Sequence, residues 1–379
     1  MSQSPTTAEV DRSPSARQIP VRILLIKPSS LGDIVHGLPV LAALRRTYPN
    51  AHISWLVNRN FADFLEGHPL VNELIVFDRK RYGKIWYHPT ALASFVAFLH
   101  KLRTRKFDLV IDLQGLFRSG FLTGMTFAKR RVGFADAREA SRWFYSERTA
   151  IDANGHAVER NVALARSLGM MVDPIVFPLA ISGADRAAAE RKLLEHGVAS
   201  GDFVAVVPGA RWPSKQWPIA KLTEVSQWLR AQGMPIVLLG APDERAAAEE
   251  ICTAVGAGAH NLAGATSLRE LSAILERASS VVCMDSGPMH IAAALQLPTI
   301  SIFGPTNPAR TGPYSDAATV VRRDALPCMP CYRRICPLGH HNCMNELESA
   351  AVTSALQRIL PPQPDACARN DYSATAQSE

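Results

Sequence analysis

A lone carboxylate, Asp33, stands in the stretch KPSSLGDIVHGLP (residues 27–39), where an apolar run gives way to a helix-like segment. The small residues Ser30 and Gly32 permit a tight turn and a close approach of the backbone to a ligand. Asp33 falls at the start of the following helix. It can cap that helix or, at the edge of a cleft, act as a general base, and the spacing leaves both interpretations open.

A second polar cluster lies in VVPGARWPSKQWP (residues 206–218), which follows an apolar strand-like run. The loop carries Arg211, Ser214 and Lys215. Such a loop can set cations and backbone donors against a phosphate group. The alternative is a surface loop whose two tryptophans pack against the domain.

The third cluster, VVCMDSGPMHIAAALQLPTISIFGPTNP (residues 281–308), combines a buried strand, a turn and a helix of small residues. Asp285, Ser286 and Gly287 form the turn, and His290 lies in the first helical turn. A helix that begins there presents free amide donors and the positive end of its dipole. The pattern therefore predicts a diphosphate-binding site.

Two further predicted strands also end in polar residues. VIDLQGLFRSG (residues 110–120) carries Asp112 and Arg118, and GAPDERAAAEE carries Glu244 just past a strand. Glu244 can accept hydrogen bonds from a ribose, whereas Asp243 beside it can simply cap the next helix.

These clusters need a scaffold, and the hydrophobic pattern predicts an α/β fold. Strand-like apolar runs alternate with helix-like segments along the chain, which indicates parallel sheets covered by helices on both faces. Near residues 170–182, prolines interrupt this alternation of strands and helices, and a second α/β series begins after them. In open parallel sheets, ligands bind beyond the carboxyl ends of the strands. Two Rossmann-like lobes would therefore present their turns to each other across a cleft.

The length of 379 residues suits two such domains. We expect a first domain over residues 21–175 and a second over 176–344. By analogy with other two-lobed folds, we expect a closing helix over 345–360 to pack back on the first domain. The polar ends, residues 1–20 and 361–379, are expected to be disordered tails.

The composition, with 47% hydrophobic and 20% charged residues, is that of an ordinary globular protein. No run of about 18 apolar residues is present, as a membrane span requires. The net charge of +7 favours acidic partners. We interpret this excess as diffuse, and with no aromatic-interleaved basic block we expect no nucleic-acid partner. The first twenty residues lack a secretory signal, so we expect a cytoplasmic protein with reduced cysteines.

Four of the seven cysteines lie in CMPCYRRICPLGHHNC (residues 328–343). Cys328, Cys331, Cys336 and Cys343 have a spacing that can close around a structural zinc or iron ion. A reduced cysteine-rich loop packed on the second domain is the alternative, and the sequence leaves both open.

Taken together, KPSSLGDIVHGLPVLAALRRTYPNAHISWLV, FDLVIDLQGLFRSG, PGARWPSKQWP, MDSGPMHIAAAL and SIFGPTNPARTGPY resemble glycosyltransferase family 9, the ADP-heptose:lipopolysaccharide heptosyltransferases. The resemblance covers residues 21–345 in order. It implies a two-lobed GT-B fold, an ADP-heptose donor on the second domain and a Kdo-lipid A acceptor on the first. It also implies inversion at the anomeric carbon with no cofactor required for transfer. The SSLGDIVHGLP and GLFRSG segments most resemble the heptosyltransferase I branch, with heptosyltransferase II or another family 9 transferase as the alternative.

The resemblance also implies site residues. Asp33 matches the family's general base, and Lys215 matches the residue that neutralises the donor diphosphate. The expected nucleotide-sugar-binding residues are Ser214, Lys215, Glu244, Asp285, Ser286, Gly287 and His290. The expected acceptor-binding residues are Ser30, Gly32, Arg81, Lys84, Arg118 and Arg142.

A non-catalytic nucleotide-sugar-binding protein on the same fold is the competing class, because a fold alone does not confer activity. The presence of Asp33 together with Lys215 and Asp285 favours the enzyme. A nucleotide-sugar epimerase on this fold would need several carboxylates and histidines around the donor sugar. The single carboxylate at the first-lobe turn suits transfer better. Since the acceptor's acyl chains stay in the inner leaflet, we also expect the protein to be peripheral to the cytoplasmic face of the inner membrane, attracted by anionic lipid.

Overall fold

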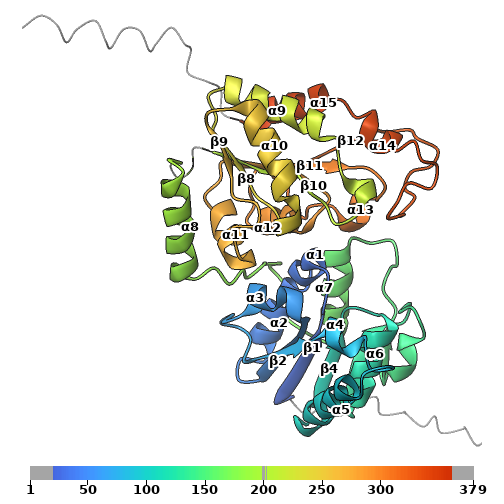
Figure 1. The fold of residues 1–379 in the computed structure, drawn as a ribbon. Helices are drawn as coiled ribbons and strands as arrows, with labels where there is room; N and C mark the ends of the chain where they lie inside the picture. The colour runs from blue at the N-terminus through green and yellow to red at the C-terminus, as the bar shows by residue number, and fades with distance from the viewer. Residues whose placement is uncertain (1–19, 199–200, 202, 361–379) are drawn as a thin grey trace, which may run out of the picture.

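The computed structural model describes residues 20–198, 201 and 203–360 and shows two α/β lobes stacked end to end (Figure 1). The predicted tails, residues 1–20 and 361–379, lie outside the described residues, except for Pro20. Within the described residues, no helix is both long and apolar enough to span a bilayer.

The first lobe is built on a six-stranded parallel sheet with the strand order β3-β2-β1-β4-β5-β6. Helices α1 to α7 and two short 3₁₀ segments connect and cover its strands (Figure 1). The strands are β1 (Arg22–Ile26), β2 (His52–Asn58), β3 (Glu73–Phe77), β4 (Leu109–Asp112), β5 (Arg130–Phe134) and β6 (Glu147–Thr149). The helices are α1 (Leu31–Val35), α2 (Leu38–Thr47), α3 (Ala62–Leu65), α4 (Arg79–Tyr82), α5 (Pro89–Thr104), α6 (Phe117–Met125) and α7 (Ala157–Ser167), with η1 (Arg59–Phe61) and η2 (Ser141–Phe144).

Strand β1 lies in the middle of this sheet and is buried on both faces. Ile23 and Leu25 belong to one hydrophobic cluster, whereas Leu24 and Ile26 belong to the cluster on the other face. A strand buried on both faces has no polar alternation, which explains the continuous apolar run in the sequence. The strand carries the Asp33 turn at its carboxyl end.

The second lobe repeats the architecture, with the strand order β12-β11-β10-β7-β8-β9. All its strand pairs are parallel. The strands are β7 (Val204–Val207), β8 (Ile236–Leu238), β9 (Ala259–Asn261), β10 (Ser280–Met284), β11 (Thr299–Phe303) and β12 (Ala318–Arg322). The helices are α8 (Gly183–Glu195), α9 (Ile219–Ala231), α10 (Arg245–Val255), α11 (Leu268–Leu275), α12 (Gly287–Ala294), α13 (Pro308–Thr311), α14 (Asn342–Asn345) and α15 (Ser349–Ile359), with η3 (Pro213–Lys215) and η4 (Pro242–Glu244).

The predicted return of the closing helix to the first lobe is wrong. Helix α15 packs against α9, β11 and β12 of the second lobe, as Figure 1 shows at the top of the molecule. Its buried side chains Val352, Ala355 and Leu356 join the same cluster as Leu222 and Val225 of α9. Packing on the second lobe already buries the apolar side of α15, so the helix does not need to cross to the first lobe.

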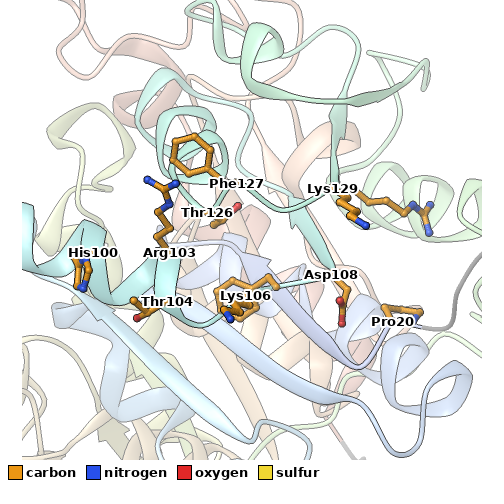
Figure 2. Close-up of a pocket in the computed structure, with 11 residues that line it drawn as sticks. Pro20, His100, Arg103, Thr104, Lys106, Asp108, Thr126, Phe127 and Lys129 are labelled. Carbon is orange, nitrogen blue, oxygen red and sulfur yellow. The ribbon is translucent and has the colours of Figure 1, made fainter.

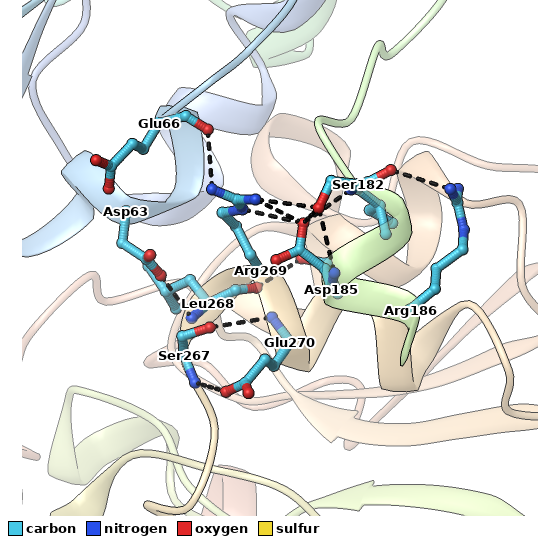
Figure 3. Close-up of polar contacts among 11 residues, drawn as sticks. Asp63, Glu66, Ser182, Asp185, Arg186, Ser267, Leu268, Arg269 and Glu270 are labelled. Atoms are coloured by element: carbon cyan, nitrogen blue, oxygen red, sulfur yellow. Dashed lines mark hydrogen bonds and ion pairs between the residues drawn. The ribbon is translucent and has the colours of Figure 1, made fainter. Parts of the chain in front are cut away.

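Helix α11 of the second lobe is tied both to its neighbour α8 and to the first lobe. Arg269 Nη2 lies 2.8 Å from Asp185 Oδ2, and Arg269 Nη1 donates to the backbone oxygen of Glu66 at 3.2 Å (Figure 3). The backbone N–H of Leu268 donates to Asp63 Oδ2 at 3.1 Å. These contacts fix the relative placement of the lobes, on which the site below depends.

Candidate active site

Asp33 lies in the first turn of α1, directly beyond the carboxyl end of β1. Its Oδ2 accepts hydrogen bonds from the Ser30 backbone N–H at 2.6 Å and from the Ser30 hydroxyl at 2.9 Å. Its Oδ1 lies 3.3 Å from Lys27 Nζ. Asp33 therefore does cap the helix, yet its side chain keeps 37% of its surface exposed. The two interpretations of this residue are compatible.

The surroundings of Asp33 stabilise its ionised form. Burial by itself would raise the pKa of Asp33, but the Lys27 ammonium and the Ser30 donors together outweigh burial and hold the pKa below its ordinary value. The carboxylate is consequently ionised at neutral pH. Lys27 is itself buried and donates to the Leu113 backbone oxygen at 2.8 Å, which fixes its position.

The two lobes meet where α1 crosses α12, and glycine makes this contact possible. A Cβ placed on Gly32 would lie 2.2 Å from Cδ2 of His290, and one on Gly287 would lie 2.7 Å from Cδ2 of Leu31. Neither distance is compatible with an unshifted neighbour. The glycines therefore let the Asp33 turn of the first lobe touch the predicted nucleotide-binding turn of the second.

Three histidines gather at this crossing. His36 Nε2 lies 3.0 Å from His290 Nδ1, and the rings of His36 and His156 have centroids 5.5 Å apart. Burial lowers the pKa of His290 to about 4, even though Asp33 and Asp285 act in the opposite direction. Burial also lowers the pKa of His36, aided by the two neighbouring histidines. The cluster is neutral at physiological pH and can share protons through hydrogen bonds.

Lys215 and Asp285 form a close ion pair on the second lobe. Lys215 Nζ, at the end of η3, lies 2.6 Å from Asp285 Oδ2, and both side chains are largely buried. The Thr306 hydroxyl donates to the same oxygen at 2.5 Å. Lys215 Nζ also lies 4.8 Å from the centroid of the Trp212 ring. Asp285 thus holds the ammonium at the carboxyl edge of the sheet, rather than presenting its own carboxylate to a ligand.

Ser286 precedes α12, and its buried hydroxyl oxygen has no hydrogen-bond partner among the described residues. A buried, unpaired hydroxyl costs about 1–3 kcal/mol unless a ligand or water satisfies it. The oxygen stands at the amino end of an eight-residue helix whose first amides are also available. This arrangement suits an anion.

Ser214 has a different environment from the one expected. Its hydroxyl donates to the Arg333 backbone oxygen at 2.5 Å, and its backbone N–H donates to the Arg334 oxygen at 3.1 Å. His341 Nε2 lies 2.7 Å from the Ser214 backbone oxygen. These bonds anchor the Lys215 loop on the cysteine-rich segment, so the Ser214 hydroxyl is already engaged within the protein.

Glu244 occupies a notch between the ends of β7 and β8. A Cβ on Gly209 would lie 1.8 Å from Glu244 Oε1, and one on Gly240 would lie 2.4 Å from Oε2. The Ala241 backbone N–H donates to Oε2 at 2.8 Å. Burial raises the pKa of this carboxyl. The glycines admit the Glu244 carboxyl group to the carboxyl edge of the second sheet.

A cavity of about 1080 Å³ opens between the lobes beside the Asp33 turn. Arg81 and Lys84 line it, as predicted for acceptor binding, whereas Arg118 and Arg142 do not. Arg118 is close enough to the cavity residue Arg79 for the two charges to interact. The cavity is strongly basic, and the second lobe contributes the last three residues of its lining. The full lining is Ser29, Asn58, Arg59, Asn60, Phe61, Asp78, Arg79, Lys80, Arg81, Lys84, His88, Thr90, Ala91, Arg211, Ala241 and Asp243.

Another cavity, of about 670 Å³, lies at the opposite edge of the first sheet (Figure 2). Asp108 and Lys129 line it and directly precede β4 and β5. Pro20, two residues before the start of β1, lines it as well. Ligands of open parallel sheets bind at the carboxyl ends of the strands, and this cavity lies at the amino ends. It is therefore separate from the candidate site.

The predicted structural metal finds no support. Among residues 20–198, 201 and 203–360, no group of three or more His, Cys, Asp or Glu side chains is arranged to hold an ion. The Cys336 sulfur receives backbone N–H groups, chiefly that of His341, which lower its pKa. Cys343 is buried, and its pKa is raised to about 11. Burial is the main cause of that rise, and the nearby Cys331, Cys328 and Cys336 add to it, so the four thiols lie near one another although they form no such ligand group. Cys328 and Cys331 are the other two cysteines of the predicted metal site.

Sequence reasoning missed three residues of this site: Lys27, His36 and Thr306. A lysine at the carboxyl end of a fully apolar strand was the available signal for Lys27. Nothing in the local pattern pairs His36 with His290, because 254 residues separate them.

Two six-stranded parallel-sheet lobes whose strand-end turns meet where α1 contacts α12 place the chain in the class of two-lobed GT-B proteins. The comparisons with known proteins agree. A model of glycosyltransferase family 9 (heptosyltransferase) matches residues 95–342. This chain belongs to glycosyltransferase family 9.

Individual relatives are similar over most of their length. Lipopolysaccharide heptosyltransferase 1 of Pseudomonas aeruginosa is 33% identical, over 83% of this chain and 87% of its own. Lipopolysaccharide heptosyltransferase 2 of Salmonella typhimurium is 28% identical, over 80% and 88%. The solved structure of the Escherichia coli heptosyltransferase WaaC with ADP is 29% identical, with a TM-score of 0.73, and the match covers 89% of this chain and all of that one.

Proposed function

We propose that this glycosyltransferase moves heptose from ADP-heptose to the Kdo sugar of lipid A, with inversion at the anomeric carbon. The observation that carries the proposal is the crossing of α1 and α12. Through it, the turn that carries Asp33 on the first lobe packs against the helix that follows the Asp285 turn on the second lobe, with Gly32 against the His290 ring. The identity to a protein named lipopolysaccharide heptosyltransferase 1, and to a structure named as a complex with ADP, supports the donor and the reaction.

Asp33 is the general base of the proposed reaction. The acceptor hydroxyl gives its proton to the Asp33 carboxylate while its oxygen forms a bond to the anomeric carbon, and the bond from that carbon to the diphosphate breaks. The lowered pKa of Asp33 supplies the ionised form at neutral pH, and its exposed surface is open to the acceptor. General-base assistance of this kind contributes roughly 10²- to 10⁴-fold in rate.

The second lobe receives the leaving ADP. Lys215, held by Asp285, and the amino end of α12 with the unpartnered Ser286 hydroxyl stabilise the charge that develops on the diphosphate. Gly287 permits the close approach, and Glu244 accepts hydrogen bonds from the ribose. His290 holds the two halves together by its contact with Gly32.

The basic cavity accommodates the anionic acceptor. Arg81 and Lys84 contact its phosphate or carboxylate groups. Ser29 lines the cavity, and Ser30 and Gly32 follow it in the same turn beside the base. Arg118 and Arg142 contact only parts of the acceptor that extend beyond the cavity. Lipid A carries acyl chains, so the enzyme works at the cytoplasmic face of the inner membrane.

The test is a transfer assay with ADP-heptose and Kdo-lipid A, with and without EDTA, on the full chain and on Asp33→Ala and Asp33→Asn. We expect transfer by the parent in both conditions and a loss of about 10²-fold or more in both variants. ADP binding measured by calorimetry should stay unchanged.

Transfer that persists at the parental rate in Asp33→Asn would remove Asp33 from the mechanism. Turnover confined to an acceptor that already carries a heptose would assign the chain to the heptosyltransferase II branch. ADP binding without turnover on any acceptor would instead favour the non-catalytic class.

A further inference from the structure

The connection between α4 and α5 exposes large apolar side chains that nothing in the described structure covers. Trp86 is 90% exposed and Tyr87 is 67% exposed. On the outer side of α5, Leu92 and Val96 lie one helical turn apart and are 48% and 56% exposed. Exposed apolar side chains are ordinary singly, but a contiguous group of this kind marks a contact surface.

Helix α5 carries apolar side chains on two sides, and only those on its inner side pack against the rest of the protein. Phe95 and Phe98 pack on Tyr82, with ring centroids 5.2 and 5.4 Å away, and Phe98 also meets Phe77. This ring cluster anchors α5 on the sheet. The outer residues Leu92 and Val96 take no part in it, so a second apolar environment is needed to bury them.

The same segment carries a concentrated positive charge. All eight charged residues between Asp78 and Asp108 are Lys or Arg, against a net charge of +7 for the whole chain. The residues are Arg79, Lys80, Arg81, Lys84, Lys101, Arg103, Arg105 and Lys106. Along the sequence the basic excess is concentrated here, but in the fold it divides between the two ends of α5. Arg79, Lys80, Arg81 and Lys84 line the cavity between the lobes, whereas Arg103 and Lys106 line the cavity at the amino ends of the strands and Arg105 pairs with Glu73.

The charged part adjoins the candidate active site. Arg79, Lys80, Arg81 and Lys84 line the basic cavity that opens beside the Asp33 turn. Trp86 and Tyr87 follow directly in a tight turn, in which the Tyr87 backbone N–H donates to the Lys84 oxygen at 3.2 Å. Along the chain, Trp86 and Tyr87 thus stand between Lys84 and His88, which both line the cavity.

We infer that Trp86, Tyr87, Leu92 and Val96, together with the neighbouring lysines and arginines, form a surface that docks on an anionic lipid bilayer. We call it the α4–α5 face. Amphipathic aromatic side chains favour the headgroup region, and each nearby lysine or arginine adds attraction to an anionic leaflet. A nucleic acid would use the charges and the aromatic rings but would leave the aliphatic Leu92 and Val96 exposed, so lipid is the better match.

The inference deepens the proposed function, since docking through a segment next to the cavity-lining residues would bring the sugar of a lipid-anchored acceptor toward Asp33 while its acyl chains stay in the bilayer. The docking itself is independent of catalysis. It is therefore tested by binding, without substrates, to vesicles of phosphatidylethanolamine and phosphatidylglycerol, with pure phosphatidylcholine vesicles for comparison.

We expect the full chain to sediment with the anionic vesicles and much less with the neutral ones. The combined variant Trp86→Ser/Leu92→Ser should lose about tenfold or more in partitioning. The matched control is Leu194→Ser, which removes a 64% exposed leucine from α8 on the second lobe and should bind as the parent does (Figure 1). Both changes are at the surface, so the thermal unfolding midpoints should stay close to that of the parent.

A second measurement uses the tryptophan itself. Brominated lipids should quench the fluorescence of the parent, and Trp86→Phe should lose most of that quenching while it still binds. Transfer to a short Kdo acceptor without acyl chains should be unaffected by Trp86→Ser/Leu92→Ser, which separates this inference from the proposed function. Equal binding by parent and double variant, an equal loss in Leu194→Ser, or a preference for single-stranded oligonucleotide over anionic vesicles would each overturn the inference.

Discussion

Lys27 Nζ lies 3.3 Å from Asp33 Oδ1 and 2.8 Å from the Leu113 backbone oxygen, so one buried ammonium joins the end of β1, the turn after β4 and the candidate base. The lysine is the strongest influence that opposes burial in setting the pKa of Asp33. The ion pair therefore determines the pH range in which the carboxylate is ionised.

Substitution of Lys27 tests this relationship. In Lys27→Met the ammonium that opposes burial is gone. The pKa of Asp33 should therefore rise, and the acid limb of the kcat/KM profile should move to higher pH. The Leu113 oxygen also loses its donor, at a cost of about 1–3 kcal/mol in the free energy of unfolding. Lys27→Arg should retain much of the parental profile. An acid limb that stays in place in Lys27→Met would disconnect Lys27 from the base.

Gly32→Ala should disrupt the closed site without unfolding either lobe. The new Cβ would lie 2.2 Å from the His290 ring on the other lobe, so the helices α1 and α12 must separate or the ring must move. We expect a large loss in kcat/KM together with a more open molecule in small-angle scattering. Gly183→Ala is the matched control, because nothing lies within 4 Å of a Cβ there. Parental activity and dimensions in Gly32→Ala would show that the contact is dispensable.

The Lys215 and Asp285 side chains should act as a coupled pair in donor binding. We expect Lys215→Met and Asp285→Asn each to weaken ADP binding, and the double variant to be less affected than the two losses combined, with a coupling energy of about 0.5–3 kcal/mol. Calorimetric titration with ADP measures all three. Lys192→Met breaks a comparable pair with Glu270, at 2.9 Å, outside the site and should leave ADP affinity unchanged. Fully additive effects would mean that Asp285 does not orient Lys215.

The neutral histidines at the crossing predict a loss of stability in mild acid. The pKa of His290 is lowered to about 4 from its ordinary value of 6.5, so between these values the unfolded chain binds more protons than the folded one. The free energy of unfolding should therefore fall as the pH drops through this window, and the His290 contribution should be fully present only above pH 6.5. The groups that face His290 are His36, His156, Asp33, Asp285 and Lys215.

Urea unfolding at several pH values checks this prediction. His290→Gln cannot be protonated, so its stability should depend less steeply on pH in that window. His100→Gln, at an exposed position on α5, should follow the parent. Identical pH dependence in the parent and His290→Gln would exclude His290 as the source of the effect.

Much of the architecture was predictable from local patterns. The continuous apolar run at residues 23–26 and its counterpart at 281–284 indicated strands buried on both faces, and both lie inside their sheets. The turn chemistry after each strand located Asp33, Lys215 and the Asp285 turn, because parallel sheets place such turns on one edge. These properties depend on residues close together in the sequence, so the two-lobed α/β fold followed from them.

The sequence by itself thus determined the order of strands and helices, the polar turns and the chemical types of the groups that they carry. Only the tertiary structure decided that Lys215 pairs with Asp285, that His290 meets Gly32 and His36, that Glu244 fills a glycine notch, and that α15 stays on the second lobe. The physical reason is distance along the chain. Such contacts depend on strand order, on side-chain volume at the crossing and on how the lobes close, none of which leaves a local periodic pattern.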